Sequence, residues 1–150
     1  TQEGECDRDT KPVIFMSYNI TGADTVKCNW IRDITEGFDV NFCAPQEHFK
    51  TVRTTEQWFI QKLLDYYTYT IPAYRLPGVD SGRGIGGLVQ MTTRSLEGKR
   101  SRVQTTSRRL QAQLLAFPAC KVLWINGYLP CDPQLQDFDD TELVATLNQV

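Results

Sequence analysis

The 150-residue sequence has little histidine, no closely spaced cysteine pair and no long apolar run, and each shortage excludes a class of protein. No stretch approaches the roughly 20 consecutive apolar residues of a membrane-spanning helix. Residues 1–10 lack the apolar segment of a secretory signal peptide. Because His48 is the only histidine and no C-x-x-C pair occurs, we expect neither a zinc site nor a Ser-His or Cys-His nucleophile.

The five cysteines are odd in number and widely spaced. This pattern favours reduced thiols in an intracellular protein, nuclear or cytoplasmic, over a secreted disulfide-linked fold. With 41% hydrophobic and 11% aromatic residues the chain can form a core, so a disordered protein is not expected. We expect a flexible leader at 1–11 and one domain over 12–150.

The alternation of apolar runs and helical spacings predicts a layered α/β sandwich with mixed sheets. Asp24 is a candidate N-cap for the first helix, and Thr54 with Gln57 predicts a capping box for the second. Pro45 predicts that its strand lies at a sheet edge or carries a bulge. A last helix is expected after Asp139. The expected helices are 25–36 and 55–65, and the expected strands are 13–19, 40–47, 67–74, 86–92, 109–117 and 121–128.

The first expected helix carries apolar side chains at Val26, Trp30, Ile31 and Ile34, the spacing of one buried helix face. Five glycines between Pro77 and Gly87 predict a loop leading into a strand. Part of this loop looks like a phosphate-binding glycine loop, but neither G-K-[ST] nor a clear helix follows it.

Basic side chains gather in the middle of the chain, where the stretch from Arg94 to Arg109 holds six Lys or Arg and one acid. Such a stretch suits the phosphate backbone of a nucleic acid, and a solvated hairpin is the alternative. The candidate nucleic-acid-binding residues are Arg83, Arg94, Lys99, Arg100, Arg102, Arg108 and Arg109.

Three residues at strand ends are candidates for chemistry. Glu47 could ligate a hard cation such as Mg²⁺, or it could be an ordinary surface residue. Asn19 could orient a carboxylate or bind phosphate, or it could serve a turn. Tyr128 could donate a hydrogen bond to a phosphate oxygen, or it could belong to the core. His48 adjoins Glu47, but neighbours in a strand face opposite ways, so the two are not expected to act together.

Four motifs stand in an order that resembles the endonuclease/exonuclease/phosphatase superfamily. Phe15–Ile20 resembles the opening strand that ends in a functional Asn, and Gln46–Phe49 resembles the Q-E motif. Gly82–Val89 is similar to the G-x-G-G strand entry, and Asn126–Pro130 to the N-x-Y-x-P motif. Within the superfamily, the residues of these motifs are most similar to those of the apurinic-type endonuclease domain of LINE-type (non-LTR) retrotransposons.

The resemblance implies Mg²⁺-dependent nicking of DNA, with Asn19, Glu47 and Tyr128 as the catalytic residues and Glu47 as the main metal ligand. The family's G-D-x-N motif and D-H pair do not occur in these 150 residues. The pattern therefore predicts the N-terminal portion of such a domain, a sandwich incomplete at its C-terminus. DNA is the implied partner and no membrane is expected.

Two alternatives stay open. One is a catalytically inactive, exapted or structural protein that keeps the half-fold and self-associates through an open sheet edge. The other is a phosphatase-type member of the same superfamily.

Overall fold

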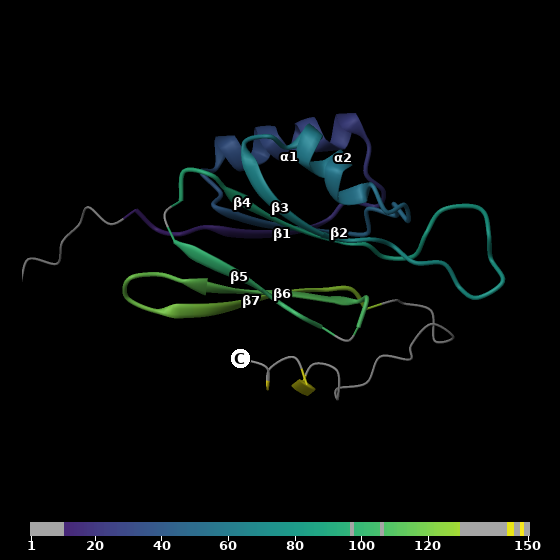
Figure 1. Ribbon diagram of the computed structural model, residues 1–150. Coiled ribbons are helices and arrows are strands. Elements are labelled where there is room, and N and C mark those ends of the chain that lie inside the picture. Colours follow the sequence, from purple (N-terminus) through teal and green to yellow (C-terminus); the bar gives the residue numbers. More distant parts are fainter. Residues whose placement is uncertain (1–10, 97, 106, 130–143, 146–147, 149–150) are drawn as a thin grey trace, which may run out of the picture.

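The computed structural model describes residues 11–96, 98–105, 107–129, 144–145 and 148. Figure 1 shows three layers, with two helices above a larger sheet and a smaller sheet below it. In the described part of the chain, no helix is both long and apolar enough to cross a bilayer. The elements in chain order are β1 (Phe15–Asn19), α1 (Thr25–Gly37), β2 (Phe42–Gln46), α2 (Thr55–Lys62), β3 (Tyr66–Ile71), β4 (Leu88–Thr93), β5 (Lys99–Val103), β6 (Leu110–Ala116) and β7 (Lys121–Gly127).

The larger sheet has the strand order β1-β2-β4-β3, and the smaller one has the order β5-β6-β7. In the larger sheet β1 and β2 are parallel, whereas β4 is antiparallel to both of its neighbours. The smaller sheet is entirely antiparallel. The one parallel pair matters most for function, because it ends two neighbouring strands at the same edge of the sheet.

An apolar core fills the space between the helices and the larger sheet. α1 contributes Cys28 and Ile31, α2 contributes Phe59, and β4 contributes Val89 and Met91. Burial of these side chains is the main force holding the helices on the sheet. It also raises the pKa of the Cys28 thiol to about 11, which keeps that thiol protonated and unreactive at neutral pH.

The layer between the two sheets is more polar than the first core. Its apolar cluster centres on Phe42 and Trp124, whose rings lie edge to face with centroids 5.2 Å apart. Around it, buried amide side chains donate across the interface. Gln90 Nε2 donates to the Trp124 carbonyl at 2.9 Å, and Gln111 Nε2 donates to the Tyr69 carbonyl at 2.6 Å. Hydrogen bonds to backbone therefore fix the register of one sheet on the other.

The expectation for Pro45 is wrong. β2 is a central strand, and Pro45 lies opposite Tyr18 in the parallel pair with β1. The ladder to β4 pairs Cys43 with Met91 and resumes with Gln46 opposite Leu88, so no residue is inserted and there is no bulge. Asn126 Nδ2, which donates to the carbonyls of Pro45 and Val89, bonds the backbone where the ladder is interrupted.

Other expectations need smaller corrections. Thr54 is the N-cap of α2 but makes no side-chain capping bond, and Thr55 Oγ1 instead donates to the Val52 carbonyl. α2 ends at Lys62, earlier than expected, because β3 already begins at Tyr66. The basic stretch contains β5, a strand absent from the expected elements. The expected last helix lies almost wholly outside the described residues.

Candidate functional site

The parallel pair β1 and β2 brings Asn19 and Glu47 to one edge of the larger sheet. Asn19 stands opposite Gln46 in the register, and Glu47 follows directly. Beyond the strands the two chains stay bonded, since Gly22 N donates to the Glu47 carbonyl at 2.6 Å. The Asn19 side chain is exposed, and its Oδ1 accepts from Thr21 N at 3.0 Å. The two candidate residues therefore lie on adjoining turns.

Backbone strain is concentrated at this edge. Thr21, Glu47 and Phe49 have positive φ angles of 46°, 60° and 62°, a region that non-glycine residues seldom adopt. The Glu47 conformation is held by its N–H, which donates to the Gly87 carbonyl at 2.9 Å. Strained backbone of this kind gathers at functional sites, because the surrounding structure must hold it in place.

Tyr128 reaches the same region from the smaller sheet. A side chain added at Gly86 would lie 3.0 Å from the Tyr128 ring, so this glycine lets the ring rest on the backbone. Gly86 also accepts a hydrogen bond from Phe49 N at 3.1 Å. The half-buried Tyr128 thus contacts Gly86, and the Gly86 carbonyl is hydrogen-bonded to Phe49, two residues beyond Glu47.

The side-chain amides of Gln46 and Asn126 are hydrogen-bonded to each other near the site, and the sequence did not indicate this pairing. Gln46 Nε2 donates to Ser17 Oγ and to Asn126 Oδ1, each at 2.8 Å. Gln46 directly precedes Glu47, and Asn126 precedes Tyr128 by two residues. Their motif positions in Gln46–Phe49 and Asn126–Pro130 were visible in the sequence, but only the fold pairs them.

His48, the neighbour of Glu47, belongs to the core. Its ring is 1% exposed and packs edge to face on Phe59. Nδ1 accepts from Lys50 N, so Nε2 carries the proton and donates to the Ile71 carbonyl at 2.9 Å. Burial lowers the pKa of His48 to about 4, so the ring is neutral at physiological pH. The ring is thus a buried, hydrogen-bonded part of the core, and both residues lie beyond the end of β2 at Gln46.

No family model and no curated protein matches the sequence. Solved structures with the same architecture include the following two. An AP endonuclease from Leishmania major has a TM-score of 0.63 over 89% of this chain, at 17% sequence identity. An endonuclease/exonuclease/phosphatase family protein from Leptotrichia buccalis has a TM-score of 0.60 over 93% of this chain, at 10% identity. The chain has the endonuclease/exonuclease/phosphatase fold.

The chain spans 47% of the Leishmania protein and 62% of the Leptotrichia protein. The expected layered α/β sandwich is confirmed, and so is the resemblance to the superfamily at the level of its fold. The partial coverage agrees with the expectation of an incomplete sandwich.

On this endonuclease/exonuclease/phosphatase fold the seven candidate basic residues separate into groups. Arg83 lies over the ring of Phe49, two residues beyond Glu47, at 4.4 Å. Arg94, Arg100 and Arg102 gather between β3 and β5. Arg109 is only 6% exposed, and its Nε and Nη2 donate to Tyr74 Oη. The remaining two, Lys99 and Arg108, are exposed.

The side chains near Glu47 suit Mg²⁺ rather than a metal that needs a full protein cage. Within the described residues no group of three His, Cys, Asp or Glu side chains could enclose a metal ion. Mg²⁺ does not need such a cage, since it keeps several waters and binds proteins through one or two carboxylates. Glu47 is half-buried and follows the residue paired with the exposed Asn19, and both side chains offer oxygen donors, which suits such a site.

Proposed function

We propose that this chain forms part of a Mg²⁺-dependent DNA endonuclease that nicks a phosphodiester bond, similar to the endonuclease domain of a LINE-type retrotransposon. The observation that carries the proposal is the convergence of Asn19 and Glu47 at the ends of two parallel strands, on a fold shared with an AP endonuclease. The four ordered motifs support the retrotransposon relationship. A nuclear or cytoplasmic location is proposed with it.

Each residue has a defined part in this proposal. Glu47 would hold Mg²⁺, and the Asn19 amide would support that ligand shell. When bound, the metal supplies a positive charge that neutralises charge developing on the phosphate. Tyr128 would donate a hydrogen bond to a phosphate oxygen. Arg83, stacked on Phe49 two residues beyond Glu47, would add a cation on this side of the phosphate.

We expect low activity from this chain, because the G-D-x-N and D-H elements, which complete the family's site, do not occur in its sequence. Groups that act as a unit lose most of their rate when members are missing. The test is nicking of supercoiled plasmid by excess protein. Slow nicking that needs Mg²⁺ and disappears in Glu47→Gln, but not in the matched control Glu36→Gln on α1, is the expected result. Nicking that persists in Glu47→Gln would refute the assignment.

A second candidate function is self-assembly without catalysis, and it rests on the exposed edge strand β1. Phe15 and Tyr18 on this strand are 44% and 43% exposed. Edge strands that present apolar side chains favour pairing with a second chain. A complete absence of plasmid nicking together with stable oligomers would favour this candidate over the nuclease.

A further inference from the structure

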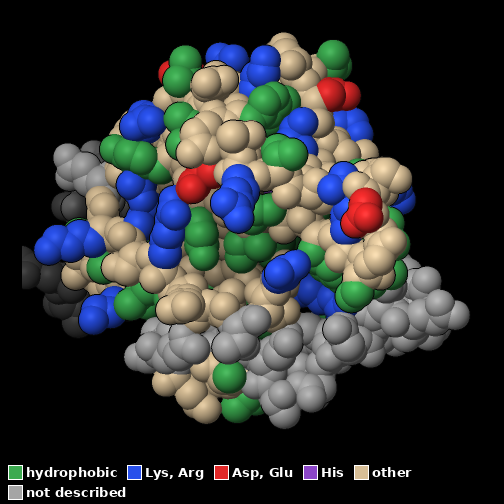
Figure 2. All heavy atoms as spheres, turned by 45° about the vertical axis from the view of Figure 1, so that its right-hand side comes forward, with side chains coloured by type: hydrophobic (Ala, Val, Ile, Leu, Met, Phe, Trp, Pro, Cys, Tyr) green, Lys and Arg blue, Asp and Glu red, His purple; other side chains and the backbone are tan. Residues whose placement is uncertain are grey.

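The second group of basic residues forms a hollow of about 290 Å³ between the edges of the two sheets, which we call the Tyr–Arg groove. Its central residues are Tyr67 and Tyr69 on β3, Arg100 and Arg102 on β5, and Arg94 after β4. Among the described residues that line it there is no Asp or Glu. Figure 2 shows a face of the molecule on which Lys and Arg side chains gather around hydrophobic ones, with few acids.

The tyrosines and arginines of the groove alternate with the period of the strands. Residues two apart in a strand point the same way, so Tyr67 and Tyr69 share one face of β3, and Arg100 and Arg102 share one face of β5. The Arg100 guanidinium lies 3.8 Å from the Tyr67 ring centre, and the Arg102 guanidinium lies 4.4 Å from that of Tyr69. The result is a row of stacked planar groups along the opening.

Positive charge in the groove exceeds what the carboxylates of the described residues balance. Arg94 and Arg100 both lie over the Tyr67 ring, at 4.4 and 3.8 Å, so two like charges converge on one aromatic group. Arg102 is paired with Glu56 at 2.6 Å. In the described part of the chain neither Arg94 nor Arg100 has an acidic partner within 4.0 Å.

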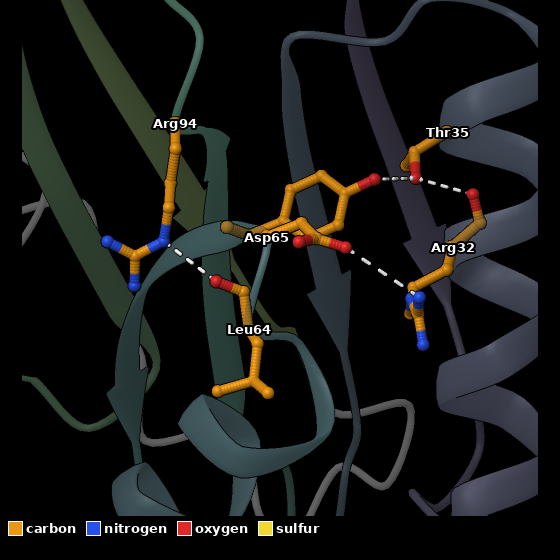
Figure 3. A network of polar contacts seen from close by, with 6 residues as sticks. Arg32, Thr35, Leu64, Asp65 and Arg94 are labelled. Atoms are coloured by element: carbon orange, nitrogen blue, oxygen red, sulfur yellow. Dashed lines mark hydrogen bonds and ion pairs between the residues drawn. The ribbon is translucent and has the colours of Figure 1, made fainter.

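Arg94 is held in place by backbone rather than by a carboxylate. Its Nε donates to the Leu64 carbonyl at 2.7 Å, which leaves its terminal nitrogens directed away from the turn (Figure 3). The nearest acid of that turn, Asp65, pairs instead with Arg32 at 3.7 Å. The guanidinium is therefore positioned in advance to receive an anion.

We infer that the Tyr–Arg groove binds single-stranded nucleic acid, at a place separate from the Glu47 edge. A single strand offers partners for both kinds of side chain in the groove. Its phosphates can accept from the guanidinium N–H donors, and its base faces can stack on aromatic or guanidinium planes. Tyr67 is 42% exposed although two guanidinium groups lie over its ring, so a base would stack on the exposed part of this residue or on those guanidinium planes. A duplex keeps its base faces inside the stack and could use only the charges.

Fluorescence anisotropy with a labelled oligothymidylate and a labelled hairpin duplex of equal length tests this inference. In Tyr67→Ala we expect roughly tenfold weaker binding of the oligothymidylate and unchanged binding of the duplex, because one stacking contact is removed. Tyr67→Phe keeps the ring and should keep the affinity. Oligothymidylate binding that is unchanged in Tyr67→Ala, or duplex binding that falls equally, would overturn the inference.

A second variant decides the matter if Tyr67→Ala fails to fold. Arg100→Ala should reduce the salt dependence of single-strand binding by about 0.7 in the log–log slope, the value for one phosphate contact. The matched control is Lys121→Ala, an exposed cation on β7 at the other edge of the same sheet. Equal slopes in both variants would overturn the inference. All of these binding measurements are made in EDTA without Mg²⁺, so they do not depend on the Glu47 site and failure of the nuclease proposal remains distinguishable.

Discussion

The Gln46 side chain donates a hydrogen bond from one sheet to Asn126 of the other, with 2.8 Å between Nε2 and Oδ1, although the residues are 80 positions apart in the sequence. Asn126 in turn donates from Nδ2 to the Val89 carbonyl at 3.0 Å. The ends of β2, β4 and β7 are thereby joined by one buried amide. Since Glu47 and Tyr128 follow these ends directly, the amide pair sets how far apart the two candidate site residues lie.

Replacing Asn126 by Ala should therefore destabilise the fold by about 2 kcal/mol. The half-buried Gln46 amide and the buried Val89 carbonyl would each lose a partner, and buried polar groups without partners are costly. Urea unfolding followed by circular dichroism measures the change. Asn29→Ala, at an exposed position on α1, is the matched control and should change stability little. Equal stabilities of the two variants would contradict this role for Asn126.

Gly87→Ala should be much more disruptive than Gly78→Ala. Both glycines have positive φ angles, 95° and 83°, so both substitutions strain the backbone by roughly 1 kcal/mol. Only at Gly87 would the new side chain meet another group, the His48 ring at 2.5 Å. We expect Gly87→Ala to lose about 3 kcal/mol or more in urea unfolding. A loss no greater than that of Gly78→Ala would mean that the His48 ring lies elsewhere.

Stability should fall between neutral and mildly acid pH because of His48. Folding lowers the pKa of this ring from its ordinary value of 6.5 to about 4, so the unfolded chain takes up the proton first as pH falls. The contribution is fully present above about pH 6.5, declines toward pH 4 and is lost below it, a change of about 3 kcal/mol. Comparing urea unfolding of the wild type and His48→Gln from pH 4 to 8 isolates it. A difference between them that stays constant with pH would contradict the assignment.

Self-association through β1 predicts a specific sedimentation result. The wild type should sediment above the monomer mass in a concentration-dependent way, and Phe15→Lys should return it to the monomer, because a charge on this edge opposes pairing. Val26→Lys is the matched control, since Val26 is 75% exposed on α1. A wild-type chain that remains monomeric at high concentration would count against the structural candidate.

Local sequence signals predicted most elements, because strand alternation and the Asp24 cap act over a few residues. Asp24 does accept from Lys27 N at 2.7 Å. β5 was not predicted, because a stretch with Arg100 and Arg102 is typical of a solvent-exposed loop. Only the fold shows that Tyr67 and Tyr69 lie against these two side chains. The apolar spacing of α1 predicted the helix but not which of its side chains are buried. The helix buries Cys28, Ile31 and Thr35, while Val26 and Trp30 remain exposed.

The candidate site was predictable only in part. The sequence placed Asn19 and Glu47 at strand ends, and the parallel pairing of β1 and β2 brings those ends together. The bond between Gln46 and Asn126 could not be predicted, because it depends on the packing of one sheet on the other. The burial of Arg109 against Tyr74 was hidden for the same reason, and charge counting alone assigned it to the surface.

The most direct test of the metal site is paramagnetic broadening of backbone amide signals by Mn²⁺, used as a stand-in for Mg²⁺. We expect signals of Asn19, Glu47 and their neighbours Gly22 and Gly86 to broaden first, and to recover when excess Mg²⁺ is added. In Glu47→Gln this local broadening should disappear, whereas Glu36→Gln should leave it intact. Broadening centred elsewhere in the chain, or unchanged in Glu47→Gln, would contradict the proposed metal site.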